Sequence, residues 1–465
     1  MIGEDVLYLS VTELGERIRT RQLSPVELTE AYLARCKKYG PQFNAYATLT
    51  PDLALQQARQ AEDEVSKGHY RGPLHGIPYA AKDLLAVKGY PTTWGAKPYQ
   101  NRRFDYNATV INKLNEAGAV LLGKAAMIEL AGGLGYRFAA ASATGAAKNP
   151  WNTNCWTCGS SSGSGAIVAA ALAAFAIGTE TWGSIVCPSA YCGVSGLRPT
   201  FGRVGRGGAM ALSYSMDKIG PLCRTAEDCS LVLTAISGHD PTDAGSLPES
   251  QAGFAYNPPK TPLRVARIEK AWEKPDPEIA SAFDDAVKVL DQAGVKTGST
   301  ALPEGPFEAA GGIIINVEAA SAFSTLIDSG GVAQLSDPLS RVGGYVAQTV
   351  DSQDYLRAQR IRRVLQQKMD LIFRQHDVLI APSLPIPAST LETNLETDLS
   401  FADPIGGIGN LCGLPVVSVP CGFTRSGLPI GIQFLAQVLN DSAAIEAAEM
   451  FQARTDWNRK HPVLH

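Results

Sequence analysis

The sequence has few histidines, no strong excess of charge of one sign and no long hydrophobic run. Six histidines are spread over 465 residues. None of them lies in a G-x-S-x-G context or at the spacing of metal ligands, so a Ser-His-Asp triad is poorly supported. The formal net charge of −4 gives no electrostatic reason to expect nucleic acid or an anionic membrane as a partner. We find no sequence repeat, heptad pattern or low-complexity tail.

Signals for membrane insertion and export are also missing. The longest apolar run, AIVAAALAAFAIG at 166–178, is shorter than the roughly 20 residues that span a bilayer. The opening MIGEDVLYLS carries no basic segment before an apolar core, unlike a signal peptide. We therefore expect a cytoplasmic protein. Nine cysteines, an odd count without a secretion signal, favour reduced thiols over a disulfide framework.

Four of these cysteines invite a comparison with metal and redox motifs. Cys155 and Cys158 have C-x-x-C spacing, and Cys187 and Cys192 could complete four thiolate ligands for zinc. The second pair has the wrong spacing, and no βαβ pattern precedes the first pair. Buried free thiols are the favoured interpretation.

Helical and strand patterns alternate along the chain, which indicates an α/β fold. Helices are expected at 24–36, 51–67, 109–117, 276–293 and 442–454, and strands at 119–123, 377–383, 416–422 and 429–437. We expect one domain over 1–465. It would comprise N-terminal helices at about 8–68, a catalytic core at about 70–230, a Pro/Gly/Asp-rich excursion at about 239–262, and further sheet and helices at about 263–456. A domain boundary within 239–262 is the alternative.

The stretch CGSSSGSG at 158–165 admits several interpretations. A P-loop needs Lys and then Ser or Thr after its second glycine, but Ala166 and Ile167 follow Gly165 here. A flexible linker stays polar on both sides, whereas the apolar run 166–178 follows at once. That run predicts a buried helix whose N-terminus, with free N–H groups, faces the Ser/Gly loop.

A serine nucleophile without a placed histidine needs another base. Lys82 follows the apolar segment GIPYAA and precedes Asp83. Burial disfavours the charged form of a lysine and lowers its pKa, so a buried lysine can act as a base. On its own, Lys82 reads as an ordinary lysine beside its counter-ion.

Together, the long blocks resemble the amidase signature family. The blocks are GIPYAAKD, CGSSSGSGAIVAAALAAFAIGTETWGSIVCPSAYCGVSGLRPTFGRV, SMDKIGPLCRTAEDC and NLCGLPVVSVPCGFTRSGLPIGIQFLAQ. They occur in the family's order, and the resemblance covers about residues 8–456. It implies an α/β fold with a mixed, largely parallel twisted central sheet covered by helices on both faces.

The resemblance also implies a Ser–cis-Ser–Lys triad. Ser184 matches the nucleophile, Ser160 the bridging serine and Lys82 the base, and the two serines lie 24 residues apart, as in the family. The implied reaction forms an acyl-enzyme on Ser184 without a metal or an organic cofactor. The further positions implied are the backbone N–H groups of Thr181, Trp182, Gly183 and Ser184 as an oxyanion hole, with Thr179 and Ser161 in support.

The sequence departs from the family pattern at positions that bear on the substrate. Trp182 and Val186 stand where Gly and Arg are common, and 125–133 reads AAMIELAGG, which is less polar than in glutamine-using members. Cys158 and Ser162 replace common glycines, with no functional explanation from the sequence. We expect Trp182, Val186, Met127 and Tyr136 to contribute to the substrate pocket.

These departures favour an uncharged, fairly apolar amide, ester or carbamate (urethane) as the substrate. Two alternatives remain at this point: the glutaminase-type component of a tRNA-dependent amidotransferase, and a non-catalytic binding protein on the same fold. The expected partner is a small-molecule substrate, with no nucleic acid and no membrane. A homodimer is a family-level expectation only.

Overall fold

The computed structural model describes residues 2–259, 262–399 and 402–464. The α-helices in these ranges are α1 Val11–Arg19, α2 Pro25–Phe43, α3 Pro51–Ser66, α4 Thr109–Glu116, α5 Ser162–Ala169, α6 Val186–Cys192, α7 Ala226–Ile236, α8 Glu249–Ala252, α9 Pro277–Gln292, α10 Phe307–Ala322, α11 Ser324–Asp328, α12 Ser340–Ala347, α13 Ser352–Phe373, α14 Pro404–Leu411 and α15 Asp441–Gln452. Short 3-10 helices lie at Glu4–Tyr8, Lys97–Tyr99, Glu129–Gly132, Gly331–Gln334 and Trp457–Arg459.

The strands form one large sheet and a separate two-stranded ribbon. They are β1 Tyr46–Leu49, β2 Pro78–Lys82, β3 Val120–Ala125, β4 Lys148–Asn149, β5 Asn152–Trp156, β6 Phe175–Glu180, β7 Ser195–Arg198, β8 Lys218–Cys223, β9 Val265–Ile268, β10 Gly298–Thr300, β11 Val378–Pro382, β12 Val416–Phe423 and β13 Pro429–Ala436. The large sheet has the order β1-β3-β2-β6-β8-β7-β12-β13-β11-β9-β10, and β4 pairs with β5.

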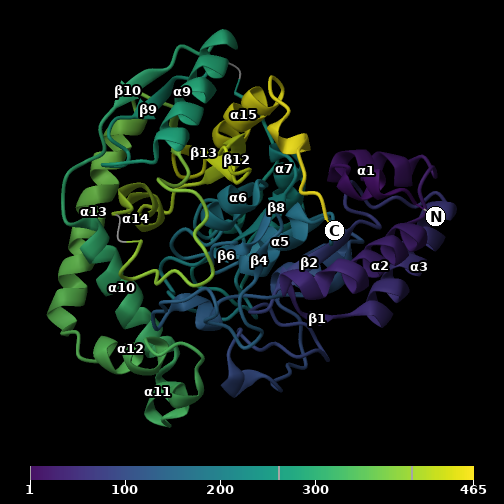
Figure 1. Cartoon of the computed structure of the whole chain (residues 1–465), viewed down its shortest axis with the longest axis horizontal. Coiled ribbons are helices and arrows are strands. Elements are labelled where there is room, and N and C mark those ends of the chain that lie inside the picture. The colour runs from purple at the N-terminus through teal and green to yellow at the C-terminus, as the bar shows by residue number, and fades with distance from the viewer. Residues whose placement is uncertain (1, 260–261, 400–401, 465) are drawn as a thin grey trace.

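The expected mixed α/β fold is confirmed. Parallel pairing joins β3, β2 and β6 on one side of the sheet and β11, β9 and β10 on the other. The neighbours between β6 and β11 pair antiparallel, as does β1 with β3. In Figure 1 the sheet lies between the N-terminal helices α1–α3 and the group α10–α13.

Helices cover both faces of the sheet, as strand β13 illustrates. A Cβ at Gly431 would meet Ala190 of α6, whereas Phe434 packs against Phe451 of α15. Side chains three positions apart on a strand point to opposite faces. Helices α6 and α15 therefore lie on opposite sides, and the sheet between them is buried on both.

Most of the expected helix starts and strands are confirmed. The Ser24 side chain accepts from the backbone N–H of Glu27 at the start of α2, and Asp276 accepts from that of Glu278 at the start of α9. Such caps satisfy N–H groups that the first helical turn leaves free. Of the expected excursion at 239–262, residues 260–261 lie outside the described ranges.

The expectation of one buried helix over 166–178 is wrong. Helix α5 begins inside the Ser/Gly loop at Ser162 and ends at Ala169. Ala171 then adopts a left-handed conformation with φ 53°, and Phe175 pairs with Tyr79 of β2 as the first residue of β6. The whole run is buried, and hydrophobic periodicity alone cannot separate a buried helix from a buried strand.

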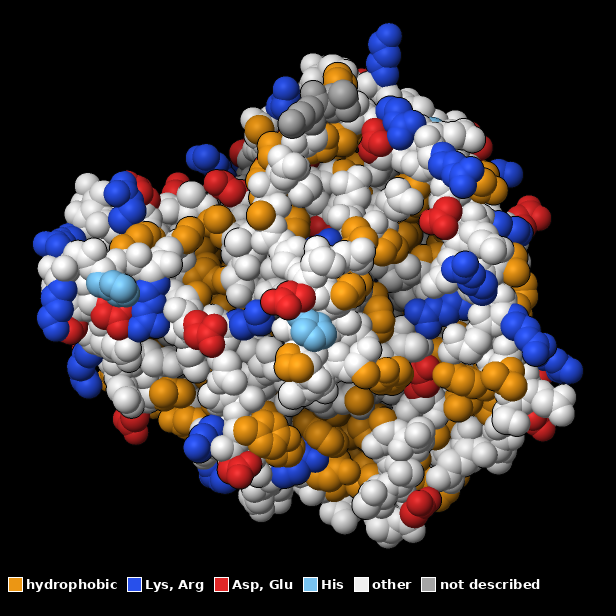
Figure 2. Space-filling model, turned by 180° about the vertical axis from the view of Figure 1, so that it is seen from behind, with side chains coloured by type: hydrophobic (Ala, Val, Ile, Leu, Met, Phe, Trp, Pro, Cys, Tyr) orange, Lys and Arg blue, Asp and Glu red, His pale blue; other side chains and the backbone are white. Residues whose placement is uncertain are grey.

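The surface carries charges of both signs. On the face shown in Figure 2, acidic and basic side chains are interspersed, with hydrophobic patches between them. A nucleic-acid footprint would instead gather basic side chains in one area. Among the described helices, none has both the length and the apolarity required to cross a bilayer.

Candidate active site

The candidate site lies where two parallel strands end and two helices begin. Lys82 is the last residue of β2, and Thr179 is the second-last residue of its parallel neighbour β6. Ser161 is the N-cap of α5, and Ser184 lies two residues before α6. The carboxyl ends of parallel strands meet at one edge of a sheet, and ligands commonly bind there.

Lys82, Ser160 and Ser184 form one chain of hydrogen bonds. The Lys82 Nζ donates to Ser160 Oγ at 2.8 Å, and Ser160 Oγ donates to Ser184 Oγ at 2.9 Å. The peptide bond between Gly159 and Ser160 is cis. All three triad side chains are buried. The structure therefore brings together, in the expected order, residues that lie 78 and 24 positions apart in the sequence.

The Lys82 ammonium has neutral hydrogen-bond partners. Besides Ser160, its Nζ donates to Ser161 Oγ at 3.0 Å and to Thr179 Oγ1 at 2.9 Å. Burial lowers the pKa of Lys82 to about 7, although Asp217 and Glu180 oppose this shift. Burial favours the neutral amine because a charged group loses its hydration there. A lysine with this pKa can accept a proton near neutral pH.

The turn at 181–184 presents free backbone donors beside Ser184. Within the part of the chain that the structure describes, the N–H groups of Trp182, Gly183 and Ser184 have no hydrogen-bond acceptor. Gly183 has φ 75°, and a Cβ there would meet no atom within 4 Å. The left-handed turn thus falls on the glycine, and Trp182 keeps an ordinary φ. Free N–H groups that converge beside a nucleophile can stabilise an oxyanion.

Two buried carboxylates hold this turn. The Glu180 carboxylate accepts from the backbone N–H groups of Ile185 and Val186 and forms a buried ion pair with Arg198. Burial opposes its ionisation, but Arg198 and the nearby Lys218 outweigh burial and lower the pKa of Glu180 to about 2. The ionised carboxylate therefore ties the end of β6 to the start of α6.

Asp217 is the second of these carboxylates. Its Oδ1 accepts from Thr181 Oγ1 at 2.5 Å, and its Oδ2 accepts from the backbone N–H groups of Leu212 and Ser213. Burial raises the pKa of Asp217. This carboxylate joins the candidate oxyanion turn to the loop before β8.

The Trp182 indole points toward two helices. Its Nε1 donates to Asp403 Oδ2 at 2.8 Å, and its ring lies where a Cβ on Gly311 of α10, or on Gly406 or Gly407 of α14, would stand. These glycines leave room for the ring. Burial raises the pKa of Asp403 to about 6, although the bond from Trp182 opposes this.

Of the other expected pocket residues, Met127 and Val186 are buried in apolar clusters. Tyr136 is half-buried, and its hydroxyl would lie 3.4 Å from a Cβ on Gly159, next to the cis peptide. Burial raises the pKa of Tyr136 to about 12. Their part in substrate binding stays a prediction.

A cavity of about 280 Å³ adjoins the site at Thr179 and Thr181. None of the four expected pocket residues is among the described residues that line it. The apolar lining residues include Leu84, Ala131, Met210, Leu212 and Ile219, and the charged ones are Arg206, Asp217, Lys218 and Asp243. Arg206 is paired with Asp243 at 2.7 Å, and burial holds the pKa of Lys218 well below its usual range.

One expectation about the cysteines is wrong. Cys158 and Cys187 form a disulfide, whereas the other seven cysteines are free and buried. The absence of a secretion signal argued for thiols, but the fold brings these two Cα atoms to 5.7 Å, which is within the ordinary range for a bridge. No zinc-type pairing with Cys155 or Cys192 is formed.

Sequence reasoning missed Glu180, Asp217 and Asp403. Glu180 lies in GTETWGS and Asp217 in SMDKIGP, two blocks that carried the resemblance. A polar residue within an apolar strand end was the available signal for both. Asp403 lies 221 positions from Trp182, and nothing in the local sequence links the two.

Fold and geometry together define an α/β protein with a buried serine–lysine chain at the carboxyl edge of its sheet. The model of the amidase family matches residues 27–445. The chain belongs to the amidase family, and the resemblance to amidase signature proteins is confirmed. Membership supports cleavage of amide bonds and indicates a hydrolase that acts on carbon–nitrogen bonds.

Similar proteins include both amidotransferase components and free-standing hydrolases. The A component of the glutamyl-tRNA(Gln) amidotransferase of Geobacter sp. (strain M21) is 33% identical over 99% of this chain and 100% of its own length. The native peptide amidase of Stenotrophomonas maltophilia is 30% identical over 98% of each chain, with a TM-score of 0.86. The structure of 6-aminohexanoate cyclic dimer hydrolase is 26% identical, covers 98% of this chain and 99% of its own, and has a TM-score of 0.87.

Proposed function

We propose that the protein hydrolyses amide bonds of small, uncharged and fairly apolar substrates through an acyl-enzyme on Ser184. The hydrogen-bonded chain from Lys82 through Ser160 to Ser184 carries this proposal. Its base is a buried lysine with a pKa of about 7, so no histidine is required. Esters and carbamates, including urethanes, would react by the same attack on a carbonyl carbon.

In the proposed reaction, the hydroxyl hydrogens turn toward the neutral lysine. Ser160 passes a proton to Lys82 Nζ as it accepts the proton of Ser184, whose Oγ attacks the carbonyl carbon. The N–H groups at 181–184 hold the oxyanion. The carbon–nitrogen bond then breaks, and the proton returns through Ser160 to the leaving amine. Water attacks the acyl-Ser184 ester by the same relay and releases the acid.

The remaining contacts of Lys82 fit a supporting role for Ser161 and Thr179. Both hydroxyls accept from Nζ, and Ser161 Oγ also bonds to the backbone of Thr179. They would keep Nζ aimed at Ser160 while the lysine gains and loses its proton. Such fixed geometry lowers the reorganisation needed in the transition state.

The substrate class follows from the cavity beside the triad. Its lining is mostly apolar, and its arginine is already paired with an aspartate. Val186 replaces the arginine that is common in the family, which disfavours a substrate carboxylate. Proteins that the chain resembles in structure include a peptide amidase and a 6-aminohexanoate cyclic dimer hydrolase, which supports a free-standing hydrolase on this fold.

The second candidate is the A component of a glutamyl-tRNA(Gln) amidotransferase. The curated relatives, at 33–34% identity over nearly the whole chain, favour it. Such a protein would form a stable complex with partner chains and use glutamine. The apolar segment AAMIELAGG and Val186 favour the free-standing hydrolase.

A substrate panel tests both candidates. Aryl anilides, esters, carbamates, primary amides and free glutamine are offered to the wild type, to Ser184→Ala and to Ser164→Ala. Ser164 is a matched control, because its buried Oγ bonds to the carbonyl of Ile177, outside the triad. We expect hydrolysis of apolar amides that Ser184→Ala loses and Ser164→Ala retains.

Three other outcomes would overturn the proposal in different ways. Undiminished activity in Ser184→Ala would refute the nucleophile. Glutamine as the one good substrate would favour the amidotransferase component. Binding of apolar amides with no turnover by the wild type would favour a non-catalytic binding protein.

A further inference from the structure

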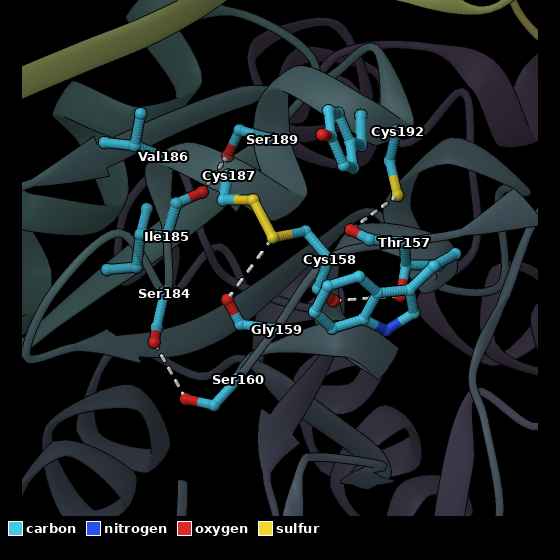
Figure 3. The surroundings of a disulfide bond; sticks show 12 residues. Thr157, Cys158, Gly159, Ser160, Ser184, Ile185, Val186, Cys187, Ser189 and Cys192 are labelled. Atoms are coloured by element: carbon cyan, nitrogen blue, oxygen red, sulfur yellow. Dashed lines mark hydrogen bonds between the residues drawn. A yellow bond between two sulfur atoms is a disulfide. The ribbon is translucent and has the colours of Figure 1, made fainter. Parts of the chain in front are cut away.

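The Cys158–Cys187 disulfide joins the two chain segments that carry the two serines of the site. Cys158 lies two residues before Ser160, and Cys187 lies three residues after Ser184. Figure 3 shows the disulfide beside the Ser160–Ser184 hydrogen bond, with both linking the same two segments. The covalent link is therefore placed to hold the distance across which the proton relay operates.

The backbone at Cys158 gives a second reason to assign this disulfide a role. Cys158 has φ 63°, in the left-handed region that favours glycine. Members of the family commonly have glycine at this position. A side chain here makes the backbone conformation less favourable, and this side chain forms the bridge to Cys187.

The other end of the disulfide is fixed to the Ser184 turn. The backbone N–H of Cys187 donates to the carbonyl of Gly183 at 2.8 Å, and Glu180 accepts from Ile185 and Val186 in the same helical turn. A displacement of Cys187 would therefore be passed to Gly183 and Ser184 through short, rigid contacts.

We propose that the Cys158–Cys187 disulfide is a covalent positioning element of the active site, so that hydrolysis is fast in the oxidised protein and slow after reduction by a dithiol. This inference rests on the proposed function. Cys158 and Cys187 touch no reacting atom and act through Ser160 and Ser184. Catalytic geometry tolerates displacements of only about 0.5 Å.

Reduction would follow ordinary thiol–disulfide exchange. A thiolate of the dithiol attacks one of the two sulfurs, the Cys158–Cys187 bond breaks, and a mixed disulfide forms. The second thiol of the reductant then displaces the remaining protein sulfur. The dithiol supplies two electrons and two protons, so the products are two cysteine thiols and the cyclic disulfide of the reductant. Disulfides in reducing compartments are commonly transient or regulatory.

The test compares kcat and KM for an apolar anilide before and after complete reduction with dithiothreitol, with two newly alkylated cysteines verified by mass spectrometry. We expect kcat to fall about tenfold, as misplacement of reacting groups costs, while KM changes less than about twofold because the cavity is untouched. The rate at which a fluorophosphonate labels Ser184 should fall in parallel, and readdition of oxidised glutathione should restore both rates.

Variants separate positioning from folding. The double variant Cys158→Gly/Cys187→Ala suits the left-handed backbone and should match the reduced wild type, with no response to dithiothreitol. Cys155→Ser is the matched control, because Cys155 is a free, buried thiol in the same apolar cluster. It should keep the wild-type response to the reductant.

The outcomes distinguish this inference from the proposed function. Equal kcat for oxidised and reduced wild type, with a lower melting temperature on reduction, would overturn the positioning role and leave the hydrolase intact. Absence of Ser184-dependent hydrolysis in the oxidised protein would instead refute the proposed function itself.

Discussion

The pKa of Lys82 predicts the pH dependence of hydrolysis. At its ordinary pKa of 10.5, roughly one lysine in 3,000 would be neutral at pH 7, whereas at a pKa of about 7 about half are neutral. Because the neutral amine is the proposed base, kcat/KM should rise with pH and reach half its plateau near pH 7. The measurement is a pH profile of kcat/KM from pH 5 to 10 on an anilide without ionisable groups, since kcat/KM reports the free enzyme.

The perturbation removes a charge that acts on Lys82. Asp217 raises the pKa of Lys82, because a nearby negative charge stabilises the ammonium. Asp217→Asn should therefore move the rising limb to lower pH, even if it also slows the reaction. Lys82→Ala should cost anilide hydrolysis more than hydrolysis of an activated ester, whose leaving group needs no returned proton. A wild-type midpoint above pH 9, or an unmoved limb in Asp217→Asn, would refute this reasoning.

Three further predictions concern the scaffold of the site. Glu180→Gln leaves the buried Arg198 without its counter-charge, so urea unfolding should show a loss of about 3–5 kcal/mol. Since the pKa of Glu180 is lowered, its contribution should be intact above pH 4.5 and be lost as the pH falls toward about 2. Trp182→Gly should cost about 2–4 kcal/mol and change the preference between aromatic and aliphatic substrates, and an unchanged preference would exclude Trp182 as a pocket wall. Reduction of the disulfide between Cys158 and Cys187, which closes a loop of 29 residues, should lower the free energy of unfolding by about 3–4 kcal/mol, and an unchanged melting temperature would contradict this.

Local signals predicted the helix starts and the outer strands of the fold well. Ser24 and Asp276 cap helices as expected because capping depends on residues within one turn. The apolar run at 166–178 was misjudged as one helix, since a chain buried on every side shows no amphipathic period. Its division at Ala171 depends on the pairing of β6 with β2, a contact between segments far apart in sequence.

The candidate triad was predicted through long matching blocks, and the surrounding groups were not. Lys82 alone looked like an ordinary lysine, and its burial among neutral hydroxyls is a property of the folded sheet edge. The disulfide was missed because the composition argument considers the compartment, whereas the bond depends on a Cα separation that the fold creates. The bond from Trp182 to Asp403 spans 221 positions and has no local signature.

Identification of the acylated residue tests the proposed mechanism most directly. A slowly released aryl carbamate is incubated with the protein, and the modified peptide is located by mass spectrometry. We predict one carbamoyl group on Ser184, formed in step with the loss of activity, absent in Ser184→Ala and formed much more slowly in Lys82→Ala. A modification on any other residue, or an equal rate of modification in Lys82→Ala, would contradict the proposed Lys82–Ser160–Ser184 relay.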